Sequence, residues 1–210
     1  MTRPTKPAAR ARPAAAYHHG DLRQALLRAA EELLGADGAA AVGMREIARR
    51  AGVSHAAPYR HYANRETLLA DLAGRGFERL NQRFAALPAR EDAERRFVAM
   101  ARAYVQFARD EPEAWRLMFG DALDKHAYPE LMRISGLAFE TLREVMQALG
   151  VAAPATSETL AAWAMAHGVA ALVLDHRIDV HVEAEVDPDE LVQRAAEVFL
   201  AGLRESRRTR

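Results

Sequence analysis

The sequence predicts an all-α protein, and three observations lead to this expectation. Apolar residues recur at spacings of three and four along most of the chain, the period of a helix with one buried face. Glycine and proline stand between these segments, where helices end and begin. Alternation typical of a strand occurs over residues 178–187, but no partner strand is evident, so this acidic segment is predicted to be a loop.

Residues 44–62 carry the most specific pattern in the sequence. Ile47 and Ala51 contribute to the apolar face of a first short helix. Gly52 is predicted to end that helix in the left-handed conformation, which only glycine adopts cheaply. Ser54 is predicted to cap a second short helix through its hydroxyl oxygen. Two short helices joined by a tight turn containing glycine are the signature of a helix-turn-helix.

The second helix of this motif presents side chains that suit a nucleic acid. Hydroxyl, guanidinium and imidazole groups donate hydrogen bonds to phosphate oxygens and base edges. The alternative interpretation is a purely structural helical hairpin, which periodicity alone leaves open. The side chains concerned are His55, Tyr59, Arg60 and His61.

Seven further helices are expected outside this motif. The first is predicted to begin at Asp21 and the long fourth one to follow Asn64, because both residues are good helix caps. The helix over 156–177 is apolar on most sides and is therefore expected to be buried on most sides. The expected ranges beyond the motif are 21–34, 65–87, 91–109, 112–119, 130–149, 156–177 and 188–205.

The balance of charge differs between the two parts of the chain. The 210 residues include 29 basic and 29 acidic side chains. The first 70 residues hold 11 basic and 6 acidic ones, whereas the remainder holds 18 and 23. A basic N-terminal third indicates that this end meets a polyanion, although a surplus this small can also arise by chance. Residues 1–16 are basic and rich in Pro and Ala, and are predicted to be a disordered tail.

Two stretches resemble the TetR/AcrR family of transcriptional regulators. "YHHGDLRQALLRAA" followed by "MREIARRAGVSHAAPYRHYANRETLL" is similar to the N-terminal pattern of the family. Trp163, His167 and Gly168 in "WAMAHGVAALVLDH" resemble the subgroup whose C-terminal domain is named for Trp, His and Gly. The resemblance implies a DNA-binding domain over 17–66 and a helical ligand-binding and dimerisation domain over 67–210, with about nine helices in all.

The resemblance also implies which residues contact DNA. Arg45 matches a residue that reads a base or a phosphate, and Arg65 stands where the family usually has Lys. Gly43 replaces a common Thr, and Pro58 replaces a common Leu. Two alanines at the start of the recognition helix offer only methyl groups, which suit thymine methyls. The candidate DNA-contacting residues are Arg45, Ser54, His55, Ala56, Ala57, Tyr59, Arg60, His61, Arg65 and His19.

The second half of the chain contains many aromatic and methionine side chains. Such side chains line apolar ligand sites, although any one of them can equally belong to the core. His167 and Trp163 lie four residues apart and hence on one helix face. The candidate ligand-lining residues are Phe77, Tyr104, Phe107, Trp115, Met118, Phe119, Phe139, Trp163 and His167.

No motif of an enzyme or a metal site is present in the sequence. Cysteine is absent, and no phosphate loop, Gly-x-Ser-x-Gly or His-Glu-x-x-His pattern occurs. The histidines of the second half lack the short spacing of metal ligands. The sequence therefore predicts no catalysis, no cofactor and no metal.

The combined expectation is a cytoplasmic homodimer that represses transcription. The resemblance implies dimerisation through the helices 156–177 and 188–205, and release from a pseudo-palindromic operator by a small apolar effector. The alternative is a constitutive DNA-binding or architectural protein whose C-terminal domain only dimerises. No membrane partner is expected, because no apolar run approaches the roughly 18 to 20 residues that span a bilayer.

Overall fold

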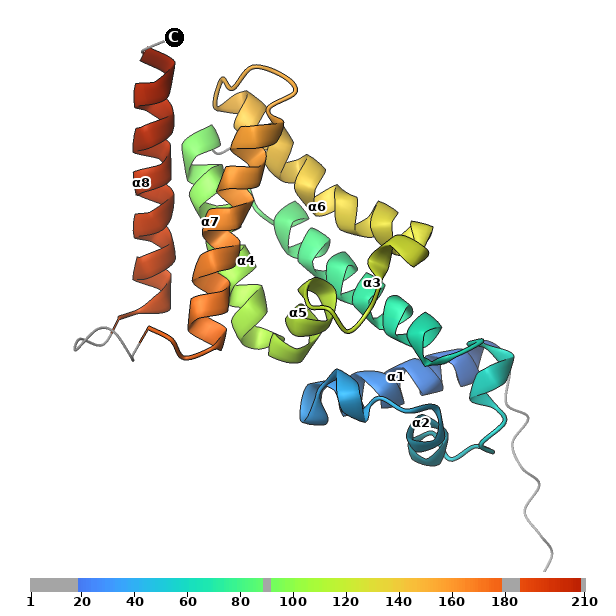
Figure 1. Cartoon of the computed structure of the whole chain (residues 1–210). Coiled ribbons are helices and arrows are strands. Elements are labelled where there is room, and N and C mark those ends of the chain that lie inside the picture. The colour runs from blue at the N-terminus through green and yellow to red at the C-terminus, as the bar shows by residue number, and fades with distance from the viewer. Residues whose placement is uncertain (1–18, 89–91, 179–185, 209–210) are drawn as a thin grey trace, which may run out of the picture.

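The computed structural model describes residues 19–88, 92–178 and 186–208, and within these ranges every regular element is a helix (Figure 1). The prediction of an all-α fold is confirmed. The predicted tail over 1–16 and most of the predicted loop over 178–187 lie outside the described residues. The α-helices are α1 (His19–Asp37), α2 (Met44–Arg50), α3 (Arg65–Ala85), α4 (Ala93–Asp110), α5 (Pro112–Phe119), α6 (Pro129–Ala148), α7 (Thr156–Leu174) and α8 (Pro188–Arg208).

Caps and prolines set the helix boundaries. The Asn64 side chain accepts from the backbone N–H of Thr67 at 2.8 Å and begins α3 as expected. Asp92 caps α4 in the same way, through the N–H of Arg95. Helices α5, α6 and α8 each begin with proline, whose missing N–H has no partner in a first turn anyway. Helix α1 begins at His19, two residues before the expected cap.

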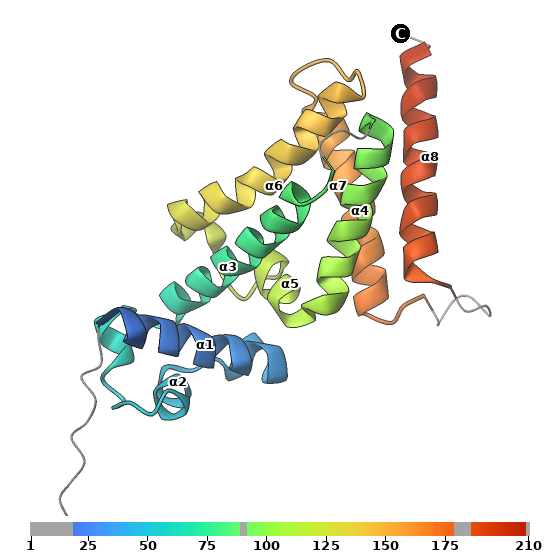
Figure 2. The ribbon, with the colours of Figure 1, turned by 180° about the vertical axis from the view of Figure 1, so that it is seen from behind.

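The helices form a small group and a large group that share α3. Helices α1 and α2 lie at one end of the molecule, and α3 runs from this end into the group formed by α4–α8 (Figures 1 and 2). Within the large group α3 packs on α6, and α4 packs on both α7 and α8. One apolar core extends through both groups, from Leu26 in α1 to Leu200 in α8. A shift of side chains at one end can therefore be transmitted to the other end through contacts within this core.

The expected recognition helix is much shorter than the sequence suggests. Between α2 and α3 the described regular structure is a single 3₁₀ turn, η2 (Pro58–Arg60). Pro58 has no N–H to donate to the carbonyl of Ser54, so that carbonyl accepts from Ala57 at 2.9 Å in a tighter turn. The prediction that Ser54 caps an α-helix is therefore wrong. The segment presents its side chains from turns rather than from a regular helix.

Helix α7 is less buried than the sequence suggests. Leu160 and Leu172 are 46% and 45% exposed, although α7 packs on α4, α6 and α8. By length and composition alone α7 is long and apolar enough to cross a membrane, but a core helix of a globular protein meets the same criteria, and α7 packs on three helices. Three helices pack on one side of α7, and no other described helix covers the side that carries Leu160 and Leu172.

Candidate DNA-binding surface and ligand cavity

The turn of the helix-turn-helix forms as its glycine predicts. Gly52 has φ of 68°, in the left-handed region. The N–H of Val53 donates to the carbonyl of Ala48 at 2.9 Å, and that of Gly52 donates to Arg49 at 3.2 Å. This pair of bonds is a Schellman motif, which satisfies the last carbonyls of α2 and turns the chain sharply.

Free donors are exposed on both sides of this turn. Arg45, His55, Tyr59 and Arg60 are exposed, Tyr59 to 56%. In the described part of the chain no carboxylate lies within 4 Å of Arg45 or Arg60. In contrast, the neighbouring Arg49 is neutralised by Glu46, whose pKa is lowered by the hydrogen bond from Arg49. The two unpaired guanidinium groups are the cations best placed for a polyanion.

Three other candidate DNA contacts are placed differently from expectation. Ala57 is only 8% exposed, so its methyl group is not available to a base. The Nε2 atom of His61 is buried without a hydrogen-bond partner among the described residues. Arg65 donates from Nε to the carbonyl of Val42 at 2.7 Å and from a terminal nitrogen to that of Ala39. Arg65 thus holds the start of α3 against the segment before α2, a role that its position in the motif does not reveal.

The remaining candidates of this group are placed as follows. Ser54 and Ala56 are exposed beside His55. His19 is the first described residue of α1, and its side chain lies outside the described part of the structure.

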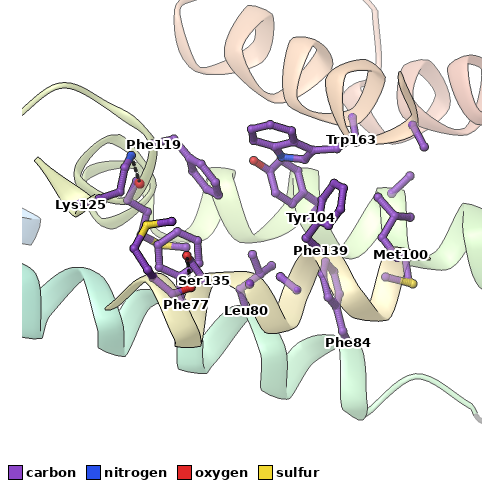
Figure 3. A pocket seen from close by; sticks show the side chains of 18 of the residues that line it. Phe77, Leu80, Phe84, Met100, Tyr104, Phe119, Lys125, Ser135, Phe139 and Trp163 are labelled. Atoms are coloured by element: carbon purple, nitrogen blue, oxygen red, sulfur yellow. Dashed lines mark hydrogen bonds between the residues drawn. The ribbon is translucent and has the colours of Figure 1, made fainter. Parts of the chain in front are cut away.

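A cavity of about 330 Å³ lies in the large group of helices (Figure 3). Side chains from α3, α4, α5, α6 and α7 form its wall, together with the segment between α5 and α6. Almost all of the wall is apolar. Six of the nine candidate ligand-lining residues belong to it, namely Phe77, Tyr104, Met118, Phe119, Phe139 and Trp163.

The other three candidates lie outside the cavity wall. Phe107 is fully buried under the guanidinium of Arg83, 5.1 Å from its ring centre. Trp115 donates from Nε1 to the Tyr104 oxygen at 3.2 Å, and that oxygen lies 2.7 Å from Nδ1 of His167. Trp115 and His167 therefore hold the Tyr104 hydroxyl in place without lining the cavity themselves. Burial, together with the charge of Lys125, lowers the pKa of His167.

Sequence reasoning missed several residues of the wall. Most are apolar residues of helices whose direction depends on packing, such as Phe84 and Met100. Lys125 is of a different kind, because it lies in a short 3₁₀ turn, η3 (Lys125–Ala127), where no helical period exists. No group of three or more metal-ligating side chains comes together in the ranges that the structure covers.

Comparisons with known families match both parts of the chain. The family described as bacterial regulatory proteins, tetR family, matches residues 26–72. The family described as tetracyclin repressor-like, C-terminal domain, matches residues 97–199. The chain belongs to the TetR family. It is accordingly a DNA-binding transcriptional regulator. Neither description names the Trp-His-Gly subgroup, which stays a prediction.

Solved structures of TetR-family shape are also similar to the chain. A protein with unknown function from Rhodococcus sp. RHA1 is 35% identical, with a TM-score of 0.77 over 90% of this chain and 98% of that one. A bacterial regulatory protein in the tetR family from Rhodococcus RHA1 is 21% identical, with a TM-score of 0.64 over 86% and 95%. The fatty acid degradation regulator FadR from Bacillus halodurans is 14% identical, with a TM-score of 0.66 over 86% and 98%. The last two support the fold alone. No curated protein matched the sequence.

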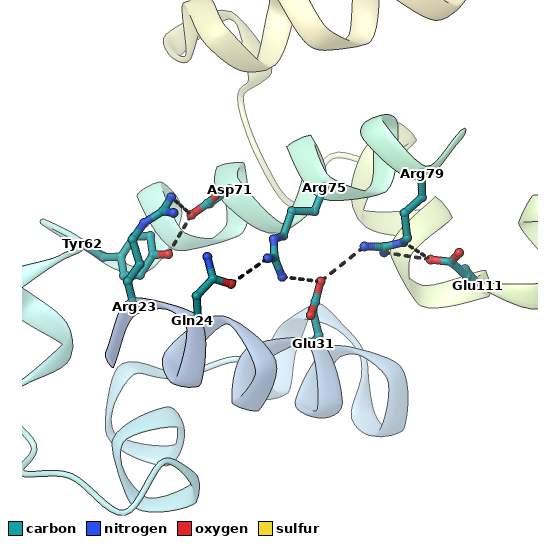
Figure 4. Close-up of polar contacts among 8 residues, drawn as sticks. All are labelled: Arg23, Gln24, Glu31, Tyr62, Asp71, Arg75, Arg79 and Glu111. Carbon is teal, nitrogen blue, oxygen red and sulfur yellow. Dashed lines mark hydrogen bonds and ion pairs between the residues drawn. The ribbon is translucent and has the colours of Figure 1, made fainter. Parts of the chain in front are cut away.

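In this TetR-family protein a polar stripe on α3 connects the helix-turn-helix to the large group of helices (Figure 4). Glu31 of α1 accepts from Arg75 at 3.0 Å and from Arg79 at 3.3 Å. Arg79 also donates to Glu111, which stands between α4 and α5, at 2.8 Å. Nearer the DNA-binding end, the Tyr62 hydroxyl donates to Asp71 at 2.7 Å. Burial raises the pKa of Tyr62, so this hydroxyl stays protonated.

Proposed function

We propose that the protein is a ligand-responsive repressor that acts as a homodimer in the cytoplasm. The observation that carries this proposal is the apolar cavity of about 330 Å³, a size typical of small-molecule sites. Helix α3 forms part of the cavity wall and, at its other end, packs on α1 of the helix-turn-helix domain. Occupancy of the cavity can therefore bias the orientation of the DNA-binding end.

The two-domain division supports this function. The helix-turn-helix domain would extend over 17–66 and the regulatory domain over 67–210, with α3 entering both. Exposed Arg45, Tyr59 and Arg60 supply donors for phosphates and bases at one end. We assign direct base readout chiefly to Arg45 and His55, because the alanines between His55 and Pro58 bear no donor.

The uncovered face of α7 and α8 supports dimerisation. Leu160, Leu172 and Val198 are exposed on these helices, Val198 to 57%. A Cβ atom added to Gly168 or Gly202 would meet no atom within 4 Å, so a second helix can approach these positions closely. A two-fold axis through this face would give two identical DNA-binding ends, which suits a pseudo-palindromic operator.

The ion pairs on α3 offer a route for the response. A ligand would contact Met118 and Phe119 at the C-terminal end of α5, and the N-cap at the other end of this short helix is Glu111, whose carboxylate holds Arg79. Glu31 shares Arg79 with Glu111 and belongs to α1. Release of DNA requires that the ligand bind more tightly to a conformer in which the two DNA-binding ends are wrongly spaced.

Footprinting on the DNA that flanks the gene, followed by a thermal-shift screen, tests the proposal. We expect two protected half-sites about 34–36 Å apart or a multiple of this. We also expect an apolar compound that raises the melting temperature and releases the DNA. At a concentration one hundred times its Kd, such a compound stabilises the protein by about 2.7 kcal/mol. A protein that binds the half-sites but responds to no compound would instead be a constitutive DNA-binding protein.

A further inference from the structure

The cavity wall contains one side chain with a permanent charge, the ammonium of Lys125. No aspartate or glutamate belongs to the wall. Lys125 is also the only lysine in the described part of the chain, where arginine supplies every other permanent side-chain cation. An ammonium is a compact and strongly hydrated point charge, so its partial burial at this wall removes hydration that another group has to replace.

The charge of Lys125 is only partly compensated. Nζ donates to the carbonyl of Met118 at 2.8 Å and to that of Gly120 at 3.5 Å, at the C-terminal end of α5. An ammonium has three N–H groups, so one of them remains available. No carboxylate of the described residues lies within 4 Å of Nζ. Burial lowers the pKa of Lys125, which means that the charged form is held in an unfavourable environment.

The charge stands at one end of an otherwise apolar space. Lys125 and Phe119 lie at one end in Figure 3, whereas Phe84, Phe139 and Met100 lie at the other. The charge of Lys125 also acts on His167, whose Nδ1 lies beside the Tyr104 hydroxyl, because it contributes to the lowered pKa of His167. Lys125 thus places a positive charge at one end of a wall that contains no aspartate or glutamate.

We propose that the effector is an apolar carboxylate whose charged end pairs with Lys125 and whose apolar body extends toward Phe84 and Phe139. This proposal rests on the proposed function, since it names the chemical class of ligand for the same cavity. A carboxylate at Nζ would accept the remaining N–H and supply the missing negative charge. A neutral compound of the same shape would leave the charge uncompensated, and an amine would be repelled.

Calorimetric binding of three matched probes tests the proposal. Decanoate, decan-1-ol and decylamine share one alkyl chain and differ at the polar end. With the wild-type protein we expect decanoate to bind about tenfold or more tightly than decan-1-ol, and decylamine to bind weakest. We expect decanoate also to release operator DNA. Equal affinity for decanoate and decan-1-ol would overturn the assignment of an anionic ligand.

Variants locate the effect at Nζ. Lys125→Met should abolish the preference for decanoate while binding of decan-1-ol persists, which also shows that the cavity is intact. Lys125→Arg should retain part of the preference. Arg133→Met removes the same charge from an exposed position on α6 outside the wall and should change nothing. An unchanged decanoate affinity in Lys125→Met would overturn the proposal.

Isotopic labelling of lysine at Nζ gives a second measurement in the unmodified protein. The sequence contains two lysines, Lys6 and Lys125, so the spectrum has few signals and Lys6 is an internal control. Decanoate should raise the pKa of Lys125 and leave that of Lys6 unchanged. A binding decanoate that shifts neither pKa would overturn the pairing. If decan-1-ol releases DNA and decanoate does not, the anionic ligand is wrong but the ligand-responsive function stands. If no apolar compound binds, the proposed function itself fails.

Discussion

The two ends of the molecule both hold unpaired positive charge, but in different surroundings. Arg45 and Arg60 are exposed to water, where a free cation is well solvated. Lys125 is half-buried beside an apolar wall, where an uncompensated charge is unfavourable. A DNA phosphate that binds Arg45 or Arg60 displaces salt ions from the surface. A ligand carboxylate that binds Lys125 instead replaces water that the ammonium has lost through burial. The two binding events should therefore differ most in their response to salt.

A salt titration of operator binding and of decanoate binding tests this difference most directly. If six to ten phosphates are contacted, operator affinity falls about a thousandfold or more between about 50 and about 200 mM salt. Binding of decanoate should change only a few-fold over the same range, because a buried pair is screened much less. Fluorescence anisotropy for DNA and calorimetry for decanoate measure the two slopes. Equal slopes would mean that Lys125 behaves as a surface charge.

Removal of one exposed arginine sharpens the exposed side of the comparison. Arg45→Ala should weaken operator binding by about ten- to a hundredfold, as expected for one base contact of about 1–3 kcal/mol. Arg28→Ala is the matched control, since Arg28 is exposed on α1 and outside the helix-turn-helix. A loss of similar size on nonspecific DNA, with a salt slope lower by about 0.9, would assign Arg45 to a phosphate instead.

A substitution at Arg65 tests whether this cation stabilises the fold or contacts DNA. Its guanidinium holds the carbonyls of Val42 and Ala39. Arg65→Met should lower the free energy of unfolding by about 1.5–3 kcal/mol without any DNA present, because bonds from a charged donor are lost. Denaturant unfolding measures this change, and Arg65→Lys should recover part of it. Unchanged stability with weaker DNA binding would return Arg65 to the phosphate contacts.

Glu31→Gln tests the connection between the two ends. Its ion pairs with Arg75 and Arg79 are partly exposed, so stability should fall by only about 1 kcal/mol or less. The factor by which a bound ligand lowers operator affinity should decrease. The affinity for ligand alone and the affinity for operator alone should change less. Binding of ligand in the presence and absence of operator measures this coupling. Asp37→Asn is the control, because Asp37 is an exposed carboxylate at the end of α1 that forms no ion pair with the described residues.

The pH dependence of stability is the smallest expected effect. His167 has a lowered pKa, so between that value and its ordinary value of about 6.5 the unfolded chain binds more protons than the folded one. The free energy of unfolding should therefore fall as the pH is lowered through about 6.5, and His167→Gln should remove this part of the dependence. The difference between the two pH profiles, measured by denaturant unfolding, isolates His167 from the other histidines. A rise in stability toward low pH would contradict the lowered pKa.

More of the DNA-binding end than of the cavity can be predicted from the sequence. The turn at Gly52 depends on neighbours in the chain, and its left-handed geometry follows from local chemistry. The effect of Pro58 is also local, because its missing N–H leaves a 3₁₀ turn over Pro58–Arg60 in place of an α-helix. Lys125 reaches the cavity only because α5 and α6 bring η3 there. Composition predicted the aromatic class of the wall, but not which members of that class face inward.

Trp163 gives the uncovered face of α7 a thermodynamic consequence. Its side chain lines the cavity and is 36% exposed on the helix expected to pair with a second copy. A side chain shared by two binding surfaces links their equilibria, so each event changes the affinity of the other by the same factor. Ligand affinity would then depend on protein concentration. In a cell, the abundance of the regulator would set the effector level at which it responds.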